Sequence, residues 1–180
     1  HGYAYVDLEI ADYHVSTDNY TQWNTGWAYR NDGVDIKTCE DTETTNGFNV
    51  GWTNQNEWMM YTVNVAQADS YEVSIRCASD VGTSVIQIIT DGSISIPNTL
   101  ISSTGGWQSW ETIPLGKIYL SSGIHELRLQ IVDGSININY LDFKGMNTGG
   151  SEDDYRSKTI HLFQNRPNPV INSTKIEFWV

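Results

Sequence analysis

Apolar and polar positions alternate over short runs in most of the chain from residue 57 onward. Residues 71–79 (YEVSIRCAS) and 124–132 (IHELRLQIV) show the alternation most clearly. Turn sequences rich in Gly, Asp and Ser separate the runs, and none of the runs has the 3.6-residue period of a helix. Because alternate side chains of a strand point to opposite faces, each run predicts a strand with one buried face. Many short strands joined by tight turns predict an all-β fold, an antiparallel β-sandwich of the jelly-roll type.

The two ends of the chain lack this pattern. Residues 11–27 (ADYHVSTDNYTQWNTGW) are polar and aromatic and predict loops. Residues 146–158 hold a Gly pair and an acidic run, which predict a linker. Residues 159–180 begin a new strand pattern but are too few to form a domain. We therefore divide the chain into a β-sandwich module over residues 1–145, a linker over 146–158 and the start of a truncated further domain over 159–180.

Charge narrows the classes of partner. The 180 residues include 22 acidic and 10 basic side chains, which gives a formal net charge of -12. Nucleic acid and anionic membranes favour basic surfaces, so neither is expected as a partner. No apolar run is long enough to span a bilayer, and membrane insertion is not expected. A monomer that binds a neutral polymer, such as an uncharged polysaccharide, fits this balance.

The glutamates and histidines of the chain, and its short motifs, do not form a pattern typical of a catalytic site. A glycosidase places two carboxyl groups about 5 to 9 Å apart across a cleft. Residue type alone makes candidates of four glutamates, Glu57, Glu72, Glu111 and Glu126. The four histidines have no metal-ligand spacing, and the chain has neither a G-x-S-x-G elbow nor a phosphate-cradling loop. Catalysis within this chain is therefore not expected.

Two tryptophans follow glycine in polar surroundings, where an aromatic ring is available to a ligand. Trp52 stands between Gly51 and the polar residues 53–55, and Trp107 follows a glycine pair. The C–H face of a pyranose stacks on an indole while neighbouring polar groups bind its hydroxyls. The alternative is that both rings cap the core. Trp110 comes at the start of a predicted strand, where packing in the core is expected.

Asn137 and Asn139 share one face of a predicted strand because they are two residues apart. Two amides on one face are poor core material unless they are hydrogen-bonded. An amide has a donor and an acceptor and can bridge adjacent sugar hydroxyls. Both residues are therefore candidates for reading sugar identity, with a structural role as the alternative.

Five segments, in the same order and at the same spacing, resemble carbohydrate-binding module family 6. They are YRNDGVDI, NVGWTNQNEWMMYTVNV, STGGWQSW, GIHELRLQI and NINYLDF, and they extend from about Tyr29 to Phe143. The resemblance implies a β-sandwich that binds polysaccharide without cleaving it. It also implies a partner within the parent protein, the catalytic domain of a secreted glycoside hydrolase.

The resemblance implies roles for individual residues. Trp52 and Trp107 are expected to clasp one sugar ring between them, and Asn137 is expected to hydrogen-bond that ring. Asn139 joins the candidate carbohydrate-binding set as its neighbour, with a structural role left open. Trp58, which opens a predicted strand, is expected to pack within the fold.

A structural calcium ion is typical of the fold that the resemblance implies. Asp142 in YLDF matches the acidic ligand of the last strand, and Glu9 in EIADY matches part of the first-strand pattern. A competing alignment places residues 2–7 (GYAYVD) at a later family segment, which implies a first strand upstream of His1. Ca²⁺ takes six or more oxygen ligands, so two carboxylates are an incomplete set. We expect calcium at Glu9 and Asp142; the alternative is that both are solvated surface acids.

The C-terminal residues carry a second resemblance. Residues 162–169 (LFQNRPNP), followed by residues 173–178 (STKIEF), resemble the start of the C-terminal sorting domain of the type IX secretion system of Bacteroidetes bacteria. The match stops after one strand, so it is the truncated start of such a domain and not a working signal. It implies a parent protein that is secreted, extracellular or at the cell surface.

The identity of the ligand depends on a shorter similarity. The segment YRNDGVDI is similar to modules on laminarinases and agarases. The resemblance therefore favours β-1,3-glucan (laminarin), with agar or xylan as the alternatives. A cell-surface adhesion module that binds protein uses the same fold and is the alternative of another class.

Cys39 and Cys77 are predicted to be free thiols. Cys77 shares a strand face with Val73 and Ile75, so it is expected in the core as a small hydrophobe. Cys39 has the opposite parity to Ile36 and is expected to point away from the face that Ile36 buries. Two side chains in different surroundings do not meet the Cα spacing of a disulfide.

Overall fold

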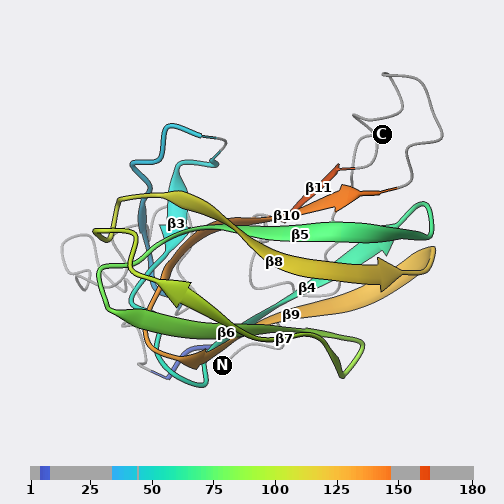
Figure 1. Ribbon diagram of the computed structural model, residues 1–180, viewed down its shortest axis with the longest axis horizontal. Helices are drawn as coiled ribbons and strands as arrows, with labels where there is room; N and C mark the ends of the chain where they lie inside the picture. The colour runs from blue at the N-terminus through green and yellow to red at the C-terminus, as the bar shows by residue number, and fades with distance from the viewer. Residues whose placement is uncertain (1–4, 9–33, 44, 147–158, 163–180) are drawn as a thin grey trace, which may run out of the picture.

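The computed structural model of the protein describes residues 5–8, 34–43, 45–146 and 159–162. Within these residues, two antiparallel β-sheets lie face to face and enclose one apolar core (Figure 1). The all-β sandwich predicted from the alternation is therefore confirmed. None of the described residues forms a helix, so this part of the chain holds no helix able to cross a membrane.

The first sheet has the strand order β1-β4-β9-β6-β7. Its strands are β1 (Tyr5–Val6), β4 (Trp58–Val65), β9 (Gly123–Asp133), β6 (Thr83–Thr90) and β7 (Ser93–Ser102). The second sheet has the order β2-β3-β10-β5-β8, and β11 also pairs with β10. Its strands are β2 (Ile36–Thr38), β3 (Phe48–Val50), β10 (Asn137–Gly145), β5 (Asp69–Ala78), β8 (Glu111–Leu120) and β11 (Thr159–Leu162).

The two sheets bury the faces that the alternation marks as apolar. In β5, Val73 and Ile75 are at most 1% exposed, and in β9 Leu127 and Leu129 are each 1% exposed. Full burial of one such side chain stabilises the folded state by about 1.5–3 kcal/mol. The core thus follows from a period of two along each strand.

The loops that lead into β4, β8 and β10 meet at one end of the sandwich, on the left in Figure 1. These loops are residues 51–57, 103–110 and 134–136. Two of them are joined directly, because the Thr53 hydroxyl donates to the Ile136 carbonyl oxygen at 2.8 Å. Each loop enters a sheet at a strand start, so side chains on all three converge at this end of the molecule.

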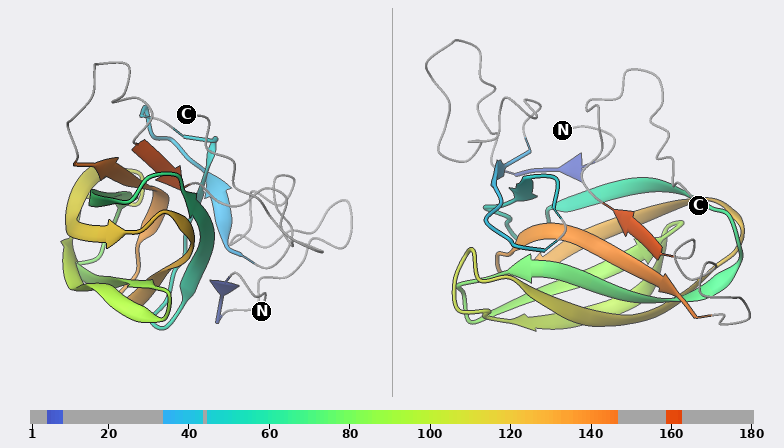
Figure 2. Two further views of the ribbon diagram at one scale, coloured as in Figure 1. Left: turned by 90° about the vertical axis from the view of Figure 1, so that its right-hand side faces the viewer. Right: turned by 90° about the horizontal axis from the view of Figure 1, so that it is seen from above.

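Strand β11 adds a further antiparallel strand to the edge of β10, opposite Leu141–Lys144 (Figure 2). The predicted start of a further domain at residue 159 therefore lies next to the module's own sheet. The sorting-domain motif in residues 163–180 lies outside the described residues, and so do Glu9 and the predicted loop over residues 11–27. The assignment of a sorting domain stays a prediction.

Cys39 and Cys77 are both free and buried, in different surroundings. Cys77 belongs to the apolar core, as predicted, and burial raises the pKa of its thiol to about 12. Cys39 is 9% exposed and lies outside the core cluster, where burial also raises its pKa. The prediction of two free thiols is confirmed.

Trp58 has a different position from the one predicted. It is half-buried and lies outside the core, because β4 buries the alternate positions Tyr61 and Val63 and so turns Trp58 to the outer face. The Arg128 guanidinium lies over its ring, 4.6 Å from the centroid. Its position at the start of a strand did not reveal which face it occupies.

Candidate ligand-binding pocket

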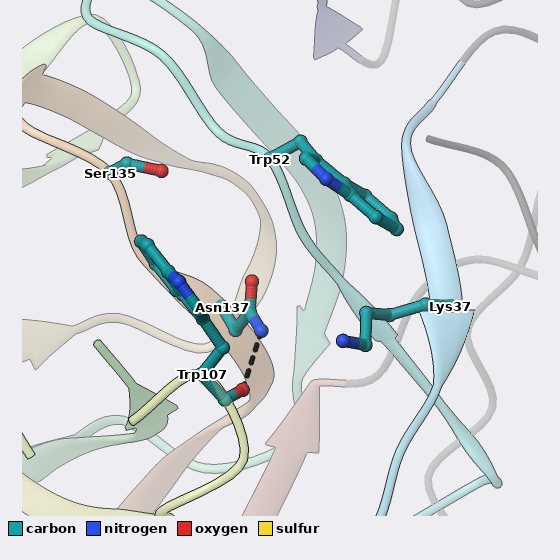
Figure 3. A pocket seen from close by; sticks show the side chains of 5 residues that line it. All are labelled: Lys37, Trp52, Trp107, Ser135 and Asn137. Carbon is teal, nitrogen blue, oxygen red and sulfur yellow. Dashed lines mark hydrogen bonds between the residues drawn. The ribbon is translucent and has the colours of Figure 1, made fainter. Parts of the chain in front are cut away.

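A pocket of about 200 Å³ opens at the loop end of the sandwich (Figure 3). The described residues that line it are Lys37, Trp52, Trp107, Ser135 and Asn137. They come from β2, from three loops and from the first residue of β10. In Figure 3 the two indoles stand on different sides of the pocket, with Asn137 between them. The structure thus brings together Trp52, Trp107 and Asn137, as the sequence predicted.

Trp52 is held in a backbone conformation that side-chain-bearing residues seldom adopt. Its φ is 50°, in the left-handed region. On one side, the Gly51 N–H donates to the Asp35 carbonyl oxygen at 3.0 Å. On the other side, the Thr53 hydroxyl also accepts from the Ile136 N–H at 2.8 Å. Such strain persists only where surrounding contacts enforce it, and it concentrates at ligand-binding positions.

Glu57 completes the turn that carries Trp52. Its carboxylate accepts hydrogen bonds from the backbone N–H of Asn54 at 2.8 Å and of Leu8 at 3.0 Å. Burial raises the pKa of this carboxyl, and those hydrogen bonds partly offset the effect. Glu57 therefore stabilises the loop, and no carboxylate is found among the described residues that line the pocket.

The Trp107 loop is fixed from two directions. The Thr104 N–H donates to the Ser79 carbonyl oxygen at 2.9 Å, and Gly105 takes a φ of 89° that glycine adopts without strain. The Asn137 side-chain amide donates to the Trp107 carbonyl oxygen at 2.6 Å. Trp107 is half-buried in this position, with part of its ring open to the pocket.

Asn137 has two tasks in this geometry. Its amide nitrogen holds the Trp107 loop, and its amide oxygen points away from that bond (Figure 3). The oxygen lies so close to Gly51 that a Cβ on that residue would stand 3.0 Å from it. Glycine at position 51 therefore lets the Trp52 turn approach Asn137.

Asn139 is not among the pocket residues. Its amide nitrogen donates to the Asp41 carboxylate at 2.9 Å, and Asp41 forms an ion pair with Arg76 at 2.7 Å. The Arg76 guanidinium, which hydrogen-bonds Asp41, is the main cause that lowers the pKa of this carboxyl to about 2. The position of Asn139 favours the structural role that the sequence left open.

Gln108 joins this region to the Trp107 loop. Its side-chain oxygen accepts hydrogen bonds from the Glu40 N–H at 3.0 Å and from the Trp110 indole nitrogen at 2.9 Å. Trp110 is half-buried and lies outside the core, which corrects its predicted position. Gln108 thus holds residues 39–43 against the loop that presents Trp107. Sequence reasoning missed this residue because its contacts join segments far apart in the chain.

Lys37 and Ser135 are the two pocket residues that sequence reasoning missed. Lys37 lies on β2 next to the fully buried Ile36, so it points to the opposite face. Its ammonium nitrogen is 5.6 Å from the centroid of the Trp52 ring. The sequence places Lys37 directly after the apolar Ile36, but β2 had not been predicted as a strand.

The described residues do not complete a calcium site. Asp142 is half-buried on β10, between Ser74 of β5 and His161 of β11 in the sheet register. Within the described ranges, no group of three or more His, Cys, Asp or Glu side chains is arranged to hold a metal ion. Two lysines, Lys117 and Lys144, line the same surface depression as Asp142. Calcium stays a prediction that depends on residues outside the described ranges, Glu9 among them.

Comparison with known proteins gives the family and its range along the chain. Residues 27–145 match the model of the family described as carbohydrate binding module (family 6). Beta-agarase AgaO of Microbulbifer thermotolerans is 30% identical over 122 residues, which are 66% of this chain and 10% of the agarase. The chain thus spans about a tenth of the length of that relative.

Two solved structures share the fold and part of the sequence. A carbohydrate-binding module from Cellvibrio mixtus lichenase 5A, in complex with cellotriose, is 29% identical with a TM-score of 0.56. The alignment covers 64% of this chain and 88% of that one. A β-1,3-glucan-binding module of family 6 from Bacillus halodurans is 28% identical with a TM-score of 0.52, over 62% of this chain and 85% of that one.

The family match includes the pocket and nearly all of both sheets. It contains Lys37, Trp52, Trp107, Ser135 and Asn137. Family 6 modules are non-catalytic, and they typically occur as parts of secreted glycoside hydrolases. With two tryptophans and an asparagine around one pocket and a matching family model across both sheets, the chain belongs to carbohydrate-binding module family 6.

Proposed function

We propose that this module binds β-1,3-glucan through the pocket between Trp52 and Trp107 and thereby holds a secreted glycoside hydrolase on its polysaccharide. The observation that carries the proposal is the convergence of Trp52, Trp107 and Asn137 on one pocket of about 200 Å³. Aromatic walls bind the C–H faces of a pyranose, and polar groups between them bind its hydroxyls. A pocket of this kind binds a sugar without supplying groups for its cleavage.

Asn137 and Ser135 supply the polar contacts in this proposal. The Asn137 amide nitrogen is already bonded to the Trp107 carbonyl, so its oxygen is the atom that accepts from a sugar hydroxyl. The Ser135 hydroxyl lines the same pocket and both donates and accepts. Stacking tolerates many sugars, so these contacts and the loop shape select among them.

The choice of β-1,3-glucan is supported by the similarity to the Bacillus halodurans module, which binds that polysaccharide. Agar is the second candidate, because the beta-agarase relative is 30% identical over 122 residues. Xylan is a further alternative of the same class.

The parent protein is proposed to be exported and to carry its catalytic domain outside this chain. Two observations support this proposal: the family is typical of secreted glycoside hydrolases, and the C-terminal residues resemble a type IX sorting domain. Immunoblots of fractionated cells test it. The parent protein is expected in the medium or on the cell surface, and a purely intracellular protein would contradict the proposal.

Affinity electrophoresis tests the proposed ligand. Native gels that contain laminarin, agaro-oligosaccharide or xylan are compared with gels without polysaccharide, and laminarin is expected to retard the protein most. A variant that carries both Trp52→Ala and Trp107→Ala should migrate as if no polysaccharide were present. Equal mobility of the wild-type protein in all gels would refute the proposal, and a reducing-sugar assay should detect no cleavage.

A further inference from the structure

Lys37 gives the pocket a charge that differs in sign from that of the molecule. It is the only charged residue among the described residues that line the pocket, whereas the whole chain has a formal net charge of -12. Its side chain reaches from β2 into the pocket that Trp52, Trp107 and Asn137 surround (Figure 3). The ammonium group of Lys37 therefore lies where the ligand is expected to bind.

The described part of the chain gives this ammonium group no carboxylate partner. Its contact is with the indole of Trp52, at 5.6 Å from the ring centroid. Other cations of the sandwich are paired differently: Arg76 with Asp41 at 2.7 Å, and Lys117 with Glu72 at 3.3 Å. Lys37 thus keeps its hydrogen-bond donors for a group that enters the pocket.

Ligand binding changes the surroundings of Lys37. A sugar ring that stacks on Trp52 competes with the ammonium group for the same indole. A neutral hydroxyl accepts a hydrogen bond from the ammonium group. An anionic oxygen accepts the same bond and adds the Coulomb attraction between opposite charges. The pocket therefore gains more from a charged sugar than from an uncharged one.

We propose that Lys37 makes this pocket select a sugar that carries an anionic substituent, a sulfate ester or a uronate carboxylate, beside the ring stacked between Trp52 and Trp107. The inference rests on the proposed function, because it uses the same pocket and adds the class of sugar. Asn137 and Ser135 bind hydroxyls, and Lys37 binds the charged group.

The negative charge of the whole molecule does not oppose this selection at physiological salt. Charges separated by more than about 8 Å are largely screened at that ionic strength. The positive charge inside the pocket then affects the binding of an anionic ligand more than the net charge of the molecule does. Binding measurements for this proposal are therefore made at physiological ionic strength.

Isothermal titration of matched ligands tests the proposal. The ligands are a laminari-oligosaccharide, the same oligosaccharide with a sulfate ester, and the same oligosaccharide oxidised to a carboxylate at C6. The wild-type protein should bind at least one charged ligand about tenfold more tightly than the neutral one. A gain for the sulfate or for the carboxylate alone identifies which anion the pocket takes.

Two variants of the full chain separate charge from shape. Lys37→Met keeps a long side chain without the charge, and it should lose the preference, measured as the ratio of charged-ligand to neutral-ligand affinity. Lys37→Arg keeps the charge and should keep the preference. Melting curves verify that both variants are folded.

The outcomes separate this inference from the proposed function. Neutral binding with no gain for either charged ligand overturns the inference and leaves the proposed function intact. A preference that persists in Lys37→Met also overturns it, because the charge then lies elsewhere. Failure of the wild-type protein to bind any of the three ligands overturns both.

Discussion

At the scale of single residues, the pocket depends on a strained tryptophan and an asparagine with two hydrogen-bonding tasks. Trp52 has a φ of 50°, and a residue held in such a region costs about 1–3 kcal/mol. Contacts of Gly51 and Thr53 on either side hold it there. Asn137 fixes the loop of the opposite wall through the Trp107 carbonyl. The two indoles are therefore positioned before a ligand arrives, which reduces the entropy cost of binding.

Replacing Trp52 or Trp107 by alanine should weaken laminarin binding in each case by about 1–3 kcal/mol, by analogy with the stacking of bases on aromatic side chains. The reason is the loss of one stacking surface, and titration calorimetry measures the effect. Tyr119→Ala is the matched control, because Tyr119 is a 69% exposed aromatic near the other end of β8. If both pocket variants bind as tightly as the wild-type protein and this control, the ligand does not contact these rings.

At the scale of elements, polar contacts join segments that the two sheets leave separate. Asp41 connects residues 39–43 to Arg76 on β5 and to Asn139 on β10. Gln108 connects the same segment to the Trp107 loop. The contacts of Asp41 and Gln108 help to position the walls of the pocket, although neither residue lines the pocket itself.

The Asp41 ion pair predicts a change of stability with pH. Arg76 lowers the pKa of Asp41 from its ordinary value of 3.8 to about 2. A lowered carboxyl pKa stabilises the folded state above the ordinary value, and this stabilisation is lost as pH falls through the lowered one. At neutral pH the contribution is roughly 2 kcal/mol.

Urea unfolding of Asp41→Asn and of the wild-type protein measures this contribution. The difference in unfolding free energy should be roughly 2 kcal/mol near neutral pH and less than half of that at about pH 2.5. Comparing the two proteins at each pH removes the effect of all other carboxylates. A difference that does not change with pH would assign the stabilisation to the shape of Asp41 and not to its charge.

His125 joins the β6–β7 turn to the β8–β9 turn. Its Nδ1 is 2.6 Å from the Asp91 carboxylate, and its Nε2 is 2.9 Å from the Ser121 carbonyl oxygen. Both partners accept, so the protonated ring is favoured and its pKa is raised, chiefly by the hydrogen bond to Asp91. The stabilisation is complete below the ordinary pKa of about 6.5 and is lost as pH rises through the raised value.

His125→Gln should therefore lower the melting temperature more at about pH 5.5 than at about pH 8.5. Asp91→Asn removes the charged partner and should show the same pH dependence. Thermal melts at both pH values measure it. If each variant lowers the melting temperature by the same amount at both pH values, titration of His125 does not contribute to stability.

At the scale of the whole molecule, the sandwich was predictable from the sequence, whereas much of the pocket was not. Alternation is a local signal, so Val73 and Ile75 marked the buried face of β5 correctly. The two tryptophans of the pocket were found through their glycine neighbours and the family resemblance. The contact between Glu40 and Gln108 joins positions 68 residues apart, and no local pattern reveals it.

Calcium is also a property of the whole module, since its predicted ligands are far apart in the sequence. If an ion is bound at the site that includes Glu9 and Asp142, excess chelator should lower the melting temperature, because the ion stabilises only the folded state. Laminarin binding should persist in the chelated protein below its melting temperature. An unchanged melting curve in chelator would show that no calcium ion stabilises the module.

NMR titration shows whether the sugar lies between Trp52 and Trp107. The indole N–H signals are assigned with single tryptophan variants and then followed as a laminari-oligosaccharide is added. The signals of Trp52 and Trp107 should shift with a common saturation curve, while those of Trp58 and Trp110 shift little. Saturable shifts confined to Trp58, or no shifts at Trp52 and Trp107, would contradict the claim.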